Sequence, residues 1–68
     1  MSDARINFDN GNWVMVPDYD KVRNLVADAI ELEAPAVELE DYSRKLMVML
    51  RNVTYIEEDK TRDNQWQR

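Results

Sequence analysis

The stretch LEDYSRKLMVMLRNVTYI at positions 39–56 decides how the rest of the chain is expected to fold. Its apolar side chains recur at alternating intervals of three and four residues, which is the spacing of the a and d positions of a coiled-coil helix. The side chains in this series are Leu39, Tyr42, Leu46, Met49, Val53 and Ile56. The spacing therefore predicts an amphipathic helix over residues 36–59.

The same stretch has a second interpretation. Lys45–Leu50 and Val53–Glu58 could form two strands around Arg51 and Asn52, because Val, Thr, Tyr and Ile favour sheets. Periodicity alone does not separate a short strand from a buried helix. We favour the helix, because Leu, Met, Arg, Lys and Glu are good helix formers and no glycine marks a turn between the two halves.

The segment before this stretch predicts a β-hairpin over residues 6–16. Asn10 and Gly11 suit a type I′ turn, which needs positive φ at both central residues, and Gly11 is the only glycine of the chain. That turn would place Phe8 opposite Trp13 on one face of the hairpin. We expect this aromatic face to pack on the helices, because an isolated hairpin is marginally stable in water.

Residues 18–33 predict another helix, and Pro35 is expected to break the chain before the helix at 36–59. The first helix has apolar residues at the spacing of one buried face: Tyr19, Val22, Leu25, Val26, Ala29 and Ile30. The predicted fold class is α+β and mainly α, with an N-terminal β-hairpin followed by two helices broken at Pro35. Residues 6–59 would form a single small domain, between a flexible N-terminus at 1–5 and a polar tail at 60–68 that contains Trp66.

The short length of the chain predicts association with a second copy. The chain has 68 residues, so its core is small, and it has neither Cys nor His, which excludes a disulfide framework and the usual zinc and haem ligand sets. We expect no cofactor and no metal. The interpretation as two helices predicts a homodimer, with the second helix contributing an interface made of Leu46, Met47, Met49, Leu50, Val53 and Ile56.

Charge predicts the kind of partner. The formal net charge of −5 disfavours direct binding to nucleic acid and to anionic membranes, because both depend on Lys and Arg. Residues 28–41 contain no Lys or Arg and hold a concentration of acids: Asp28, Glu31, Glu33, Glu38, Glu40 and Asp41. We expect these six side chains to bind a basic protein partner. A solvated corner that only maintains solubility is the alternative.

No segment is apolar enough to span a bilayer, and the N-terminus lacks the pattern of a signal peptide. We therefore expect a cytoplasmic protein, in the host cytoplasm if the chain is encoded by a phage. Catalysis is not expected, because the chain has no His, no Cys and no glycine-rich phosphate loop.

The expected function is that of a small non-enzymatic acidic protein that dimerises and binds a basic macromolecule, such as a phage-type inhibitor of a host nucleic-acid-binding or defence protein. The first alternative is a structural or assembly component, for example of a virion, that self-associates through its hairpin and C-terminal tail.

The second alternative is a small DNA-binding regulator. A strand followed by two helices is similar in order to the ribbon-helix-helix repressors, which read DNA with a basic strand. Here the segment before Pro17 has Arg5 as its only base, set against Asp3 and Asp9.

Overall fold

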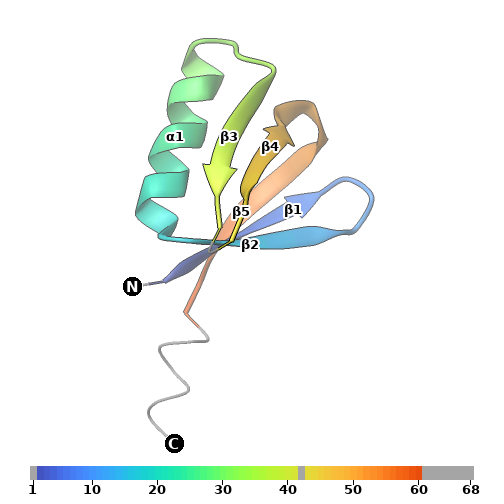
Figure 1. Ribbon diagram of the computed structural model, residues 1–68. Coiled ribbons are helices and arrows are strands. Elements are labelled where there is room, and N and C mark those ends of the chain that lie inside the picture. The colour runs from blue at the N-terminus through green and yellow to red at the C-terminus, as the bar shows by residue number, and fades with distance from the viewer. Residues whose placement is uncertain (1, 42, 61–68) are drawn as a thin grey trace, which may run out of the picture.

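The computed structural model describes residues 2–41 and 43–60, and its described part is mostly β (Figure 1). Its described residues form five strands in two antiparallel sheets, with strand orders β2-β1-β5 and β3-β4, and one α-helix. In chain order the elements are β1 (Asp3–Phe8), β2 (Trp13–Pro17), α1 (Tyr19–Glu31), β3 (Ala36–Glu40), β4 (Lys45–Met49), the 3₁₀-helix η1 (Leu50–Asn52) and β5 (Val53–Asp59).

The helix predicted over residues 36–59 is wrong, and with it the prediction of a mainly α fold with two helices and a helical hairpin. Inside β3 and β4 less and more exposed side chains alternate, with Val37, Leu39 and Val48 buried between more exposed neighbours. This period of two is that of a strand with one face on the core. The intervals of three and four arose because positions from three different strands were read as one series. The order of a ribbon-helix-helix repressor is therefore absent from the described residues.

The turn between β3 and β4 forms without a glycine. The carboxylate of Asp41 accepts hydrogen bonds from the backbone amides of Ser43 and Arg44, both at 2.9 Å, and the Asp41 amide donates to the Arg44 carbonyl at 3.0 Å. An aspartate that satisfies backbone amides two and three residues later is a common turn former. The junction at Arg51 and Asn52, where no glycine marks a turn, is likewise formed without one, by the 3₁₀-helix η1, so the absence of glycine there was poor evidence for a continuous helix.

The second interpretation of this stretch identified the strands but not their partners. β4 pairs with β3, and β5 pairs with β1, which lies almost fifty residues earlier in the chain. The pairing of β5 with β1 places Ile56 opposite Ile6 and contains an irregularity between Asn7 and Phe8. There the Thr54 hydroxyl donates to the Asn7 carbonyl at 3.2 Å.

The predicted hairpin at 6–16 is present as β1 and β2, but its register differs by one residue. Trp13 lies opposite Asn7, and Val14 lies opposite Ile6. The loop has three residues, because Phe8 and Asn12 are joined by a hydrogen bond of 2.9 Å from the Phe8 amide, and Gly11 has φ of +87°. A turn followed by a left-handed glycine is the common three-residue hairpin loop, so the positive φ at Gly11 was right and the type I′ turn was not.

The helix predicted over 18–33 is confirmed as α1. The Asp18 side chain accepts a hydrogen bond from the Lys21 amide at its start, and Val22, Val26 and Ala29 are buried. Its end is a Schellman motif, with Glu33 in the left-handed region at φ of +57°. The motif is closed by hydrogen bonds from the Glu33 amide to the Ile30 carbonyl and from the Ala34 amide to the Ala29 carbonyl.

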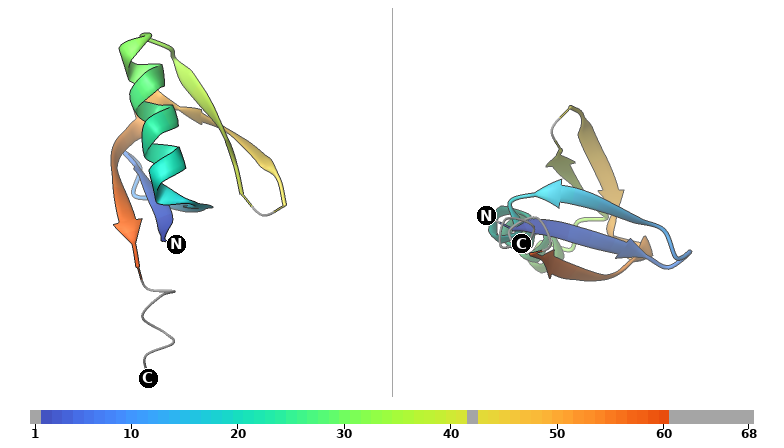
Figure 2. Two further views of the ribbon diagram at one scale, coloured as in Figure 1. Left: turned by 90° about the vertical axis from the view of Figure 1, so that its left-hand side faces the viewer. Right: turned by 90° about the horizontal axis from the view of Figure 1, so that it is seen from below.

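One hydrophobic core joins the two sheets and α1. The largest fully buried side chains are Ile6, Leu39, Val16 and Val22. Figure 2 shows the β3–β4 hairpin projecting away from the three-stranded sheet, with α1 beside both. Residues 1–5 were expected to be flexible, but β1 begins at Asp3 and Ala4 is fully buried. Of the expected polar tail at 60–68, the positions after Lys60, including Trp66, lie outside the described residues.

Candidate functional site

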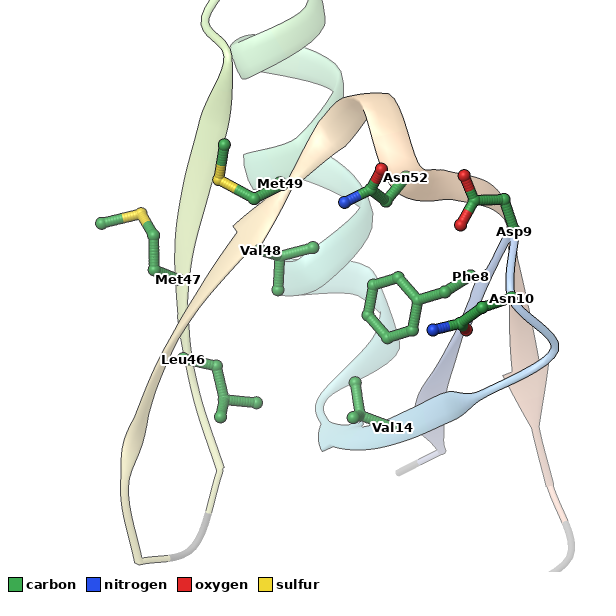
Figure 3. Close-up of a pocket in the computed structure, with 9 residues that line it drawn as sticks. All are labelled: Phe8, Asp9, Asn10, Val14, Leu46, Met47, Val48, Met49 and Asn52. Atoms are coloured by element: carbon green, nitrogen blue, oxygen red, sulfur yellow. The ribbon is translucent and has the colours of Figure 1, made fainter.

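An apolar groove of about 340 Å³ lies between the β1–β2 hairpin and β4. Phe8 and Val14 extend into it from the hairpin, and Leu46 and Val48 extend toward them from β4 (Figure 3). Its polar end is formed by Asp9, Asn10 and Asn52. The described residues that line the groove belong to β1, β2, β4 and their turns, whereas α1 lies behind it. The core is thus covered by the helix on one side and open at the groove.

The residues predicted as a dimer interface do not share one surface. Leu50, Val53 and Ile56 are partly buried and pack against the hydrophobic core, and Leu46 extends into the groove. Met47 and Met49 belong to the β4 wall of the groove, but their side chains point away from its interior and are 64% and 39% exposed. Met47 and Met49 are therefore the two of the six that the fold leaves most available to another chain.

The six acidic residues predicted to bind a partner fall into three places. Asp28 and Glu31 are exposed near the C-terminal end of α1, and Glu33 follows directly after it. Glu38 and Glu40 are exposed on the face of β3 opposite to its buried side chains. Asp41 begins the β3–β4 turn. The acids at the end of α1 and those of β3 therefore lie on successive elements. Asp41 lies at the far end of β3 from the helix.

Asp41 has a structural role in its turn. Its carboxylate accepts hydrogen bonds from two backbone amides, and its Oδ2 also lies 3.0 Å from the Arg44 Nε. The hydrogen bond from the Ser43 amide, followed by the one from the Arg44 side chain, lowers the pKa of the Asp41 carboxyl below its ordinary value. Its carboxylate is already used by its own hairpin.

The other five carboxylates have no such partners within the part of the chain that the structure describes. Within residues 2–41 and 43–60, no ion pair involves Asp28, Glu31, Glu33, Glu38 or Glu40, whereas Glu57 and Glu58 are near Arg5 and Lys60. The last turn of α1 contains no base. Negative charge near a helix C-terminus is unfavourable by about 0.3–1 kcal/mol for each group, because the partial charge there is also negative. The acids at this end of α1 therefore oppose the stability of the helix.

The outer face of the three-stranded sheet carries a cluster that the sequence analysis did not identify. The Arg5 guanidinium carbon lies 4.4 Å from the centre of the Trp13 ring, within the range of a cation–π contact. The Asn7 side chain donates to Glu57 Oε1 at 3.1 Å, and Trp13 is 49% exposed. The predicted register had turned Trp13 toward the core, since a slip of one residue moves every side chain to the other face. Asn10 and Gly11 suit a two-residue and a three-residue loop alike, so the local sequence did not decide this register.

Other chemistry is not indicated among the described residues. No group of three or more Asp and Glu side chains within 2–41 and 43–60 is placed to hold a metal ion. No helix in this part of the chain is long and apolar enough to cross a membrane. Comparisons of the chain with protein-family profiles, with curated proteins and with solved structures give no match.

Proposed function

We propose that this protein is a non-enzymatic binding protein that docks on a basic macromolecular partner through its acidic face. We define this face as the five exposed carboxylates of α1, the following turn and β3: Asp28, Glu31, Glu33, Glu38 and Glu40. A basic groove that normally receives the phosphates of a nucleic acid would be a complementary surface, so the action would be inhibitory. We place this function in the cytoplasm, which for a phage product is that of the host.

The observation that carries this proposal is the local cost of the acidic face. Glu33 occupies a left-handed conformation that glycine or asparagine adopts more easily, and it stands at a helix end where negative charge is unfavourable. Natural sequences break such local rules mainly at functional sites. A basic partner would relieve the repulsion at this end of α1. An assembly component is the second candidate, which the exposed Met47 and Met49 favour.

Two double variants with equal charge test the proposal. Glu33→Gln with Glu38→Gln neutralises one residue of the acidic face after α1 and one in β3. Asp9→Asn with Asp20→Asn neutralises two exposed acids elsewhere. The probe is an immobilised lysine- and arginine-rich peptide, and the association rate is measured at several salt concentrations.

We expect the Glu33/Glu38 variant to associate several-fold more slowly and with a weaker dependence on salt, because surface charges act mainly on the rate of encounter. The Asp9/Asp20 variant should remain close to the unmodified protein. Equal slowing of both variants would mean that net charge alone governs the binding, and the acidic face would then be an ordinary solvated surface. Capture from a host lysate with both variants as baits would identify partners that require the face.

A further inference from the structure

The hydrogen-bond pattern of the β3–β4 hairpin identifies which backbone groups of β4 are unused. The Asp41 amide donates a hydrogen bond to the Arg44 carbonyl, and the Leu50 amide donates one to the Pro35 carbonyl. Residues 41 and 44 are therefore a hydrogen-bonded pair of the ladder, and so are residues 35 and 50. In an antiparallel ladder such pairs alternate with pairs that do not exchange hydrogen bonds. Leu46 and Val48 therefore direct their amides and carbonyls toward β3. Those of Lys45, Met47 and Met49 point to the other edge, where no described strand pairs with β4.

This edge lacks the features by which proteins usually protect an unpaired strand. Such edges are commonly blocked by proline, a bulge or charged side chains near the centre of the strand. β4 has none of these at its centre, where Met47 stands with 64% of its surface exposed. Its only charged residue is Lys45 at one end. A two-stranded sheet is also a marginal unit by itself, so another strand would stabilise this hairpin.

Electrostatics make this edge the place where two copies of the acidic chain can approach. Residues 42–56 contain no Asp or Glu, although the chain as a whole has a net charge of −5. The bases at the start of β4 are balanced locally, because Arg44 pairs with Asp41 at 3.0 Å and Lys45 lies opposite Glu40. β4 itself therefore contributes no negative charge to this edge, so the net charge of the chain opposes the approach of two copies less here than at its acidic surfaces.

From these observations we infer that the protein forms a homodimer in which β4 pairs antiparallel with β4 of a second copy. The register is centred on Met47, which places Met47 opposite its own equivalent and Lys45 opposite Met49 of the other copy. On the face of the groove, Leu46 then lies opposite Val48. This register pairs all three outward-pointing residues of each strand. It also gives the closed twofold symmetry that is most common among homodimers.

The groove supplies the second half of the interface. Its wall on the β4 side consists of residues 46–49, so a strand added to this edge lies along the opening of the groove. Leu46 and Val48 of the added strand project to the same side as their equivalents, toward Phe8 and Val14. Four apolar side chains from each copy then line one continuous surface. The inference rests on the backbone edge of β4 and not on the basic partner, although Glu38 and Glu40 of the acidic face lie opposite Met47 and Lys45 on β3.

The first test is the molar mass in solution, measured by light scattering from about 5 to 500 µM. We expect a mass of twice 8.1 kDa at the upper end of this range. A protein that remains monomeric at 500 µM overturns the inference.

The second test locates the interface with two matched variants. Met47→Lys places a charge at the centre of the proposed interface, and Leu32→Lys makes the same change at a residue that is 80% exposed after α1. Met47→Lys should raise the dissociation constant of the dimer at least tenfold without lowering the melting temperature of the monomer. Leu32→Lys should leave the dissociation constant of the dimer unchanged. Because lysine lowers the net negative charge, a loss of dimer cannot come from general repulsion.

The third test traps the twofold contact. The chain has no cysteine, so Met47→Cys introduces a single thiol, and directly opposite residues of paired strands lie within the Cα separation that a disulfide accepts. Under mild oxidation Met47→Cys should form a covalent dimer much faster than Leu32→Cys. Equal rates for the two variants, or a dimer that survives Met47→Lys, would show that the copies meet elsewhere and would overturn the proposed edge.

Discussion

The two β-hairpins of this protein differ in what the rest of the chain adds to them. β1 and β2 gain a third strand, because β5 returns to pair with β1, and β1 thereby becomes the centre of a sheet. β3 and β4 gain no further strand from the described residues and contribute their inner face to the same core. The difference teaches that the status of a hairpin is decided by a distant segment. Among the described residues β1 is paired on both sides, whereas β4 is paired on one side alone.

The largest expected effects compare the core contributions of the two hairpins. Ile6 in β1 and Leu39 in β3 are each 1% exposed, and replacing either by alanine should remove about 2–5 kcal/mol from the free energy of unfolding. Both variants should unfold in one transition when followed by circular dichroism in urea, because the two sheets share one core. A Leu39→Ala variant with unchanged stability would mean that the second hairpin does not pack on the core.

The turn of the first hairpin should be more sensitive than its neighbours. Gly11→Ala should destabilise the protein by about 1–2 kcal/mol, because an alanine is strained at φ of +87°. A Cβ at Gly11 would meet no atom within 4 Å, so the effect is one of backbone conformation alone. Asn12→Ala is the control in thermal melts and should have the smaller effect. Similar losses would argue against the left-handed glycine.

The junction between the hairpins offers a stabilising change. Glu33→Gly should raise the free energy of unfolding by up to about 1 kcal/mol. Glycine adopts the left-handed conformation without strain, and the change also removes a negative charge from the helix end. For a chain of this size the gain in free energy corresponds to a few degrees in the melting temperature. The same variant should bind the basic peptide more slowly than the unmodified protein. Greater stability with unchanged binding would separate Glu33 from the acidic face.

The smallest effect concerns the turn of the second hairpin. The pKa of Asp41 is lowered in the folded protein, so its carboxylate stabilises the fold at neutral pH, and this contribution disappears as the pH falls through the lowered pKa. Asp41→Asn should therefore melt slightly below the unmodified protein at pH 7. The difference in melting temperature should narrow at pH values well below 3.8, the ordinary pKa of an aspartate. A difference that is independent of pH would mean that the charge of Asp41 contributes nothing.

The sequence predicted those elements whose signals are local. The buried face of α1, the break after it at Pro35 and the positive φ of Gly11 each depend on residues within a few positions of one another. The register of the first hairpin failed because Asn10 and Gly11 suit two kinds of turn, and the choice between them is made by the pairing of Asn7 with Trp13.

The second half failed for a different reason. Leu, Met and Lys in β4 favour helix weakly, and tertiary packing overrides such preferences. The pairing of Ile56 with Ile6 joins residues fifty positions apart, so no local sequence pattern predicts it. For the candidate site, the sequence located the acids but not their division between a turn, a helix end and a strand. The groove depends on both sheets and had no signal of its own.

The most direct test of the fold is a contact between β1 and β5 seen by nuclear magnetic resonance. Thr54 bonds to the Asn7 carbonyl and Asp9 bonds to Asn52, so the β1 residues with odd numbers face β5 and Ile6 and Ile56 form a pair without hydrogen bonds. In such pairs the two Cα atoms are about 4.5 Å apart, which brings their Hα protons close together. The account predicts a strong nuclear Overhauser effect between the Hα protons of Ile6 and Ile56. Its absence, together with continuous amide-to-amide effects over residues 36–59, would contradict the account and indicate a helix.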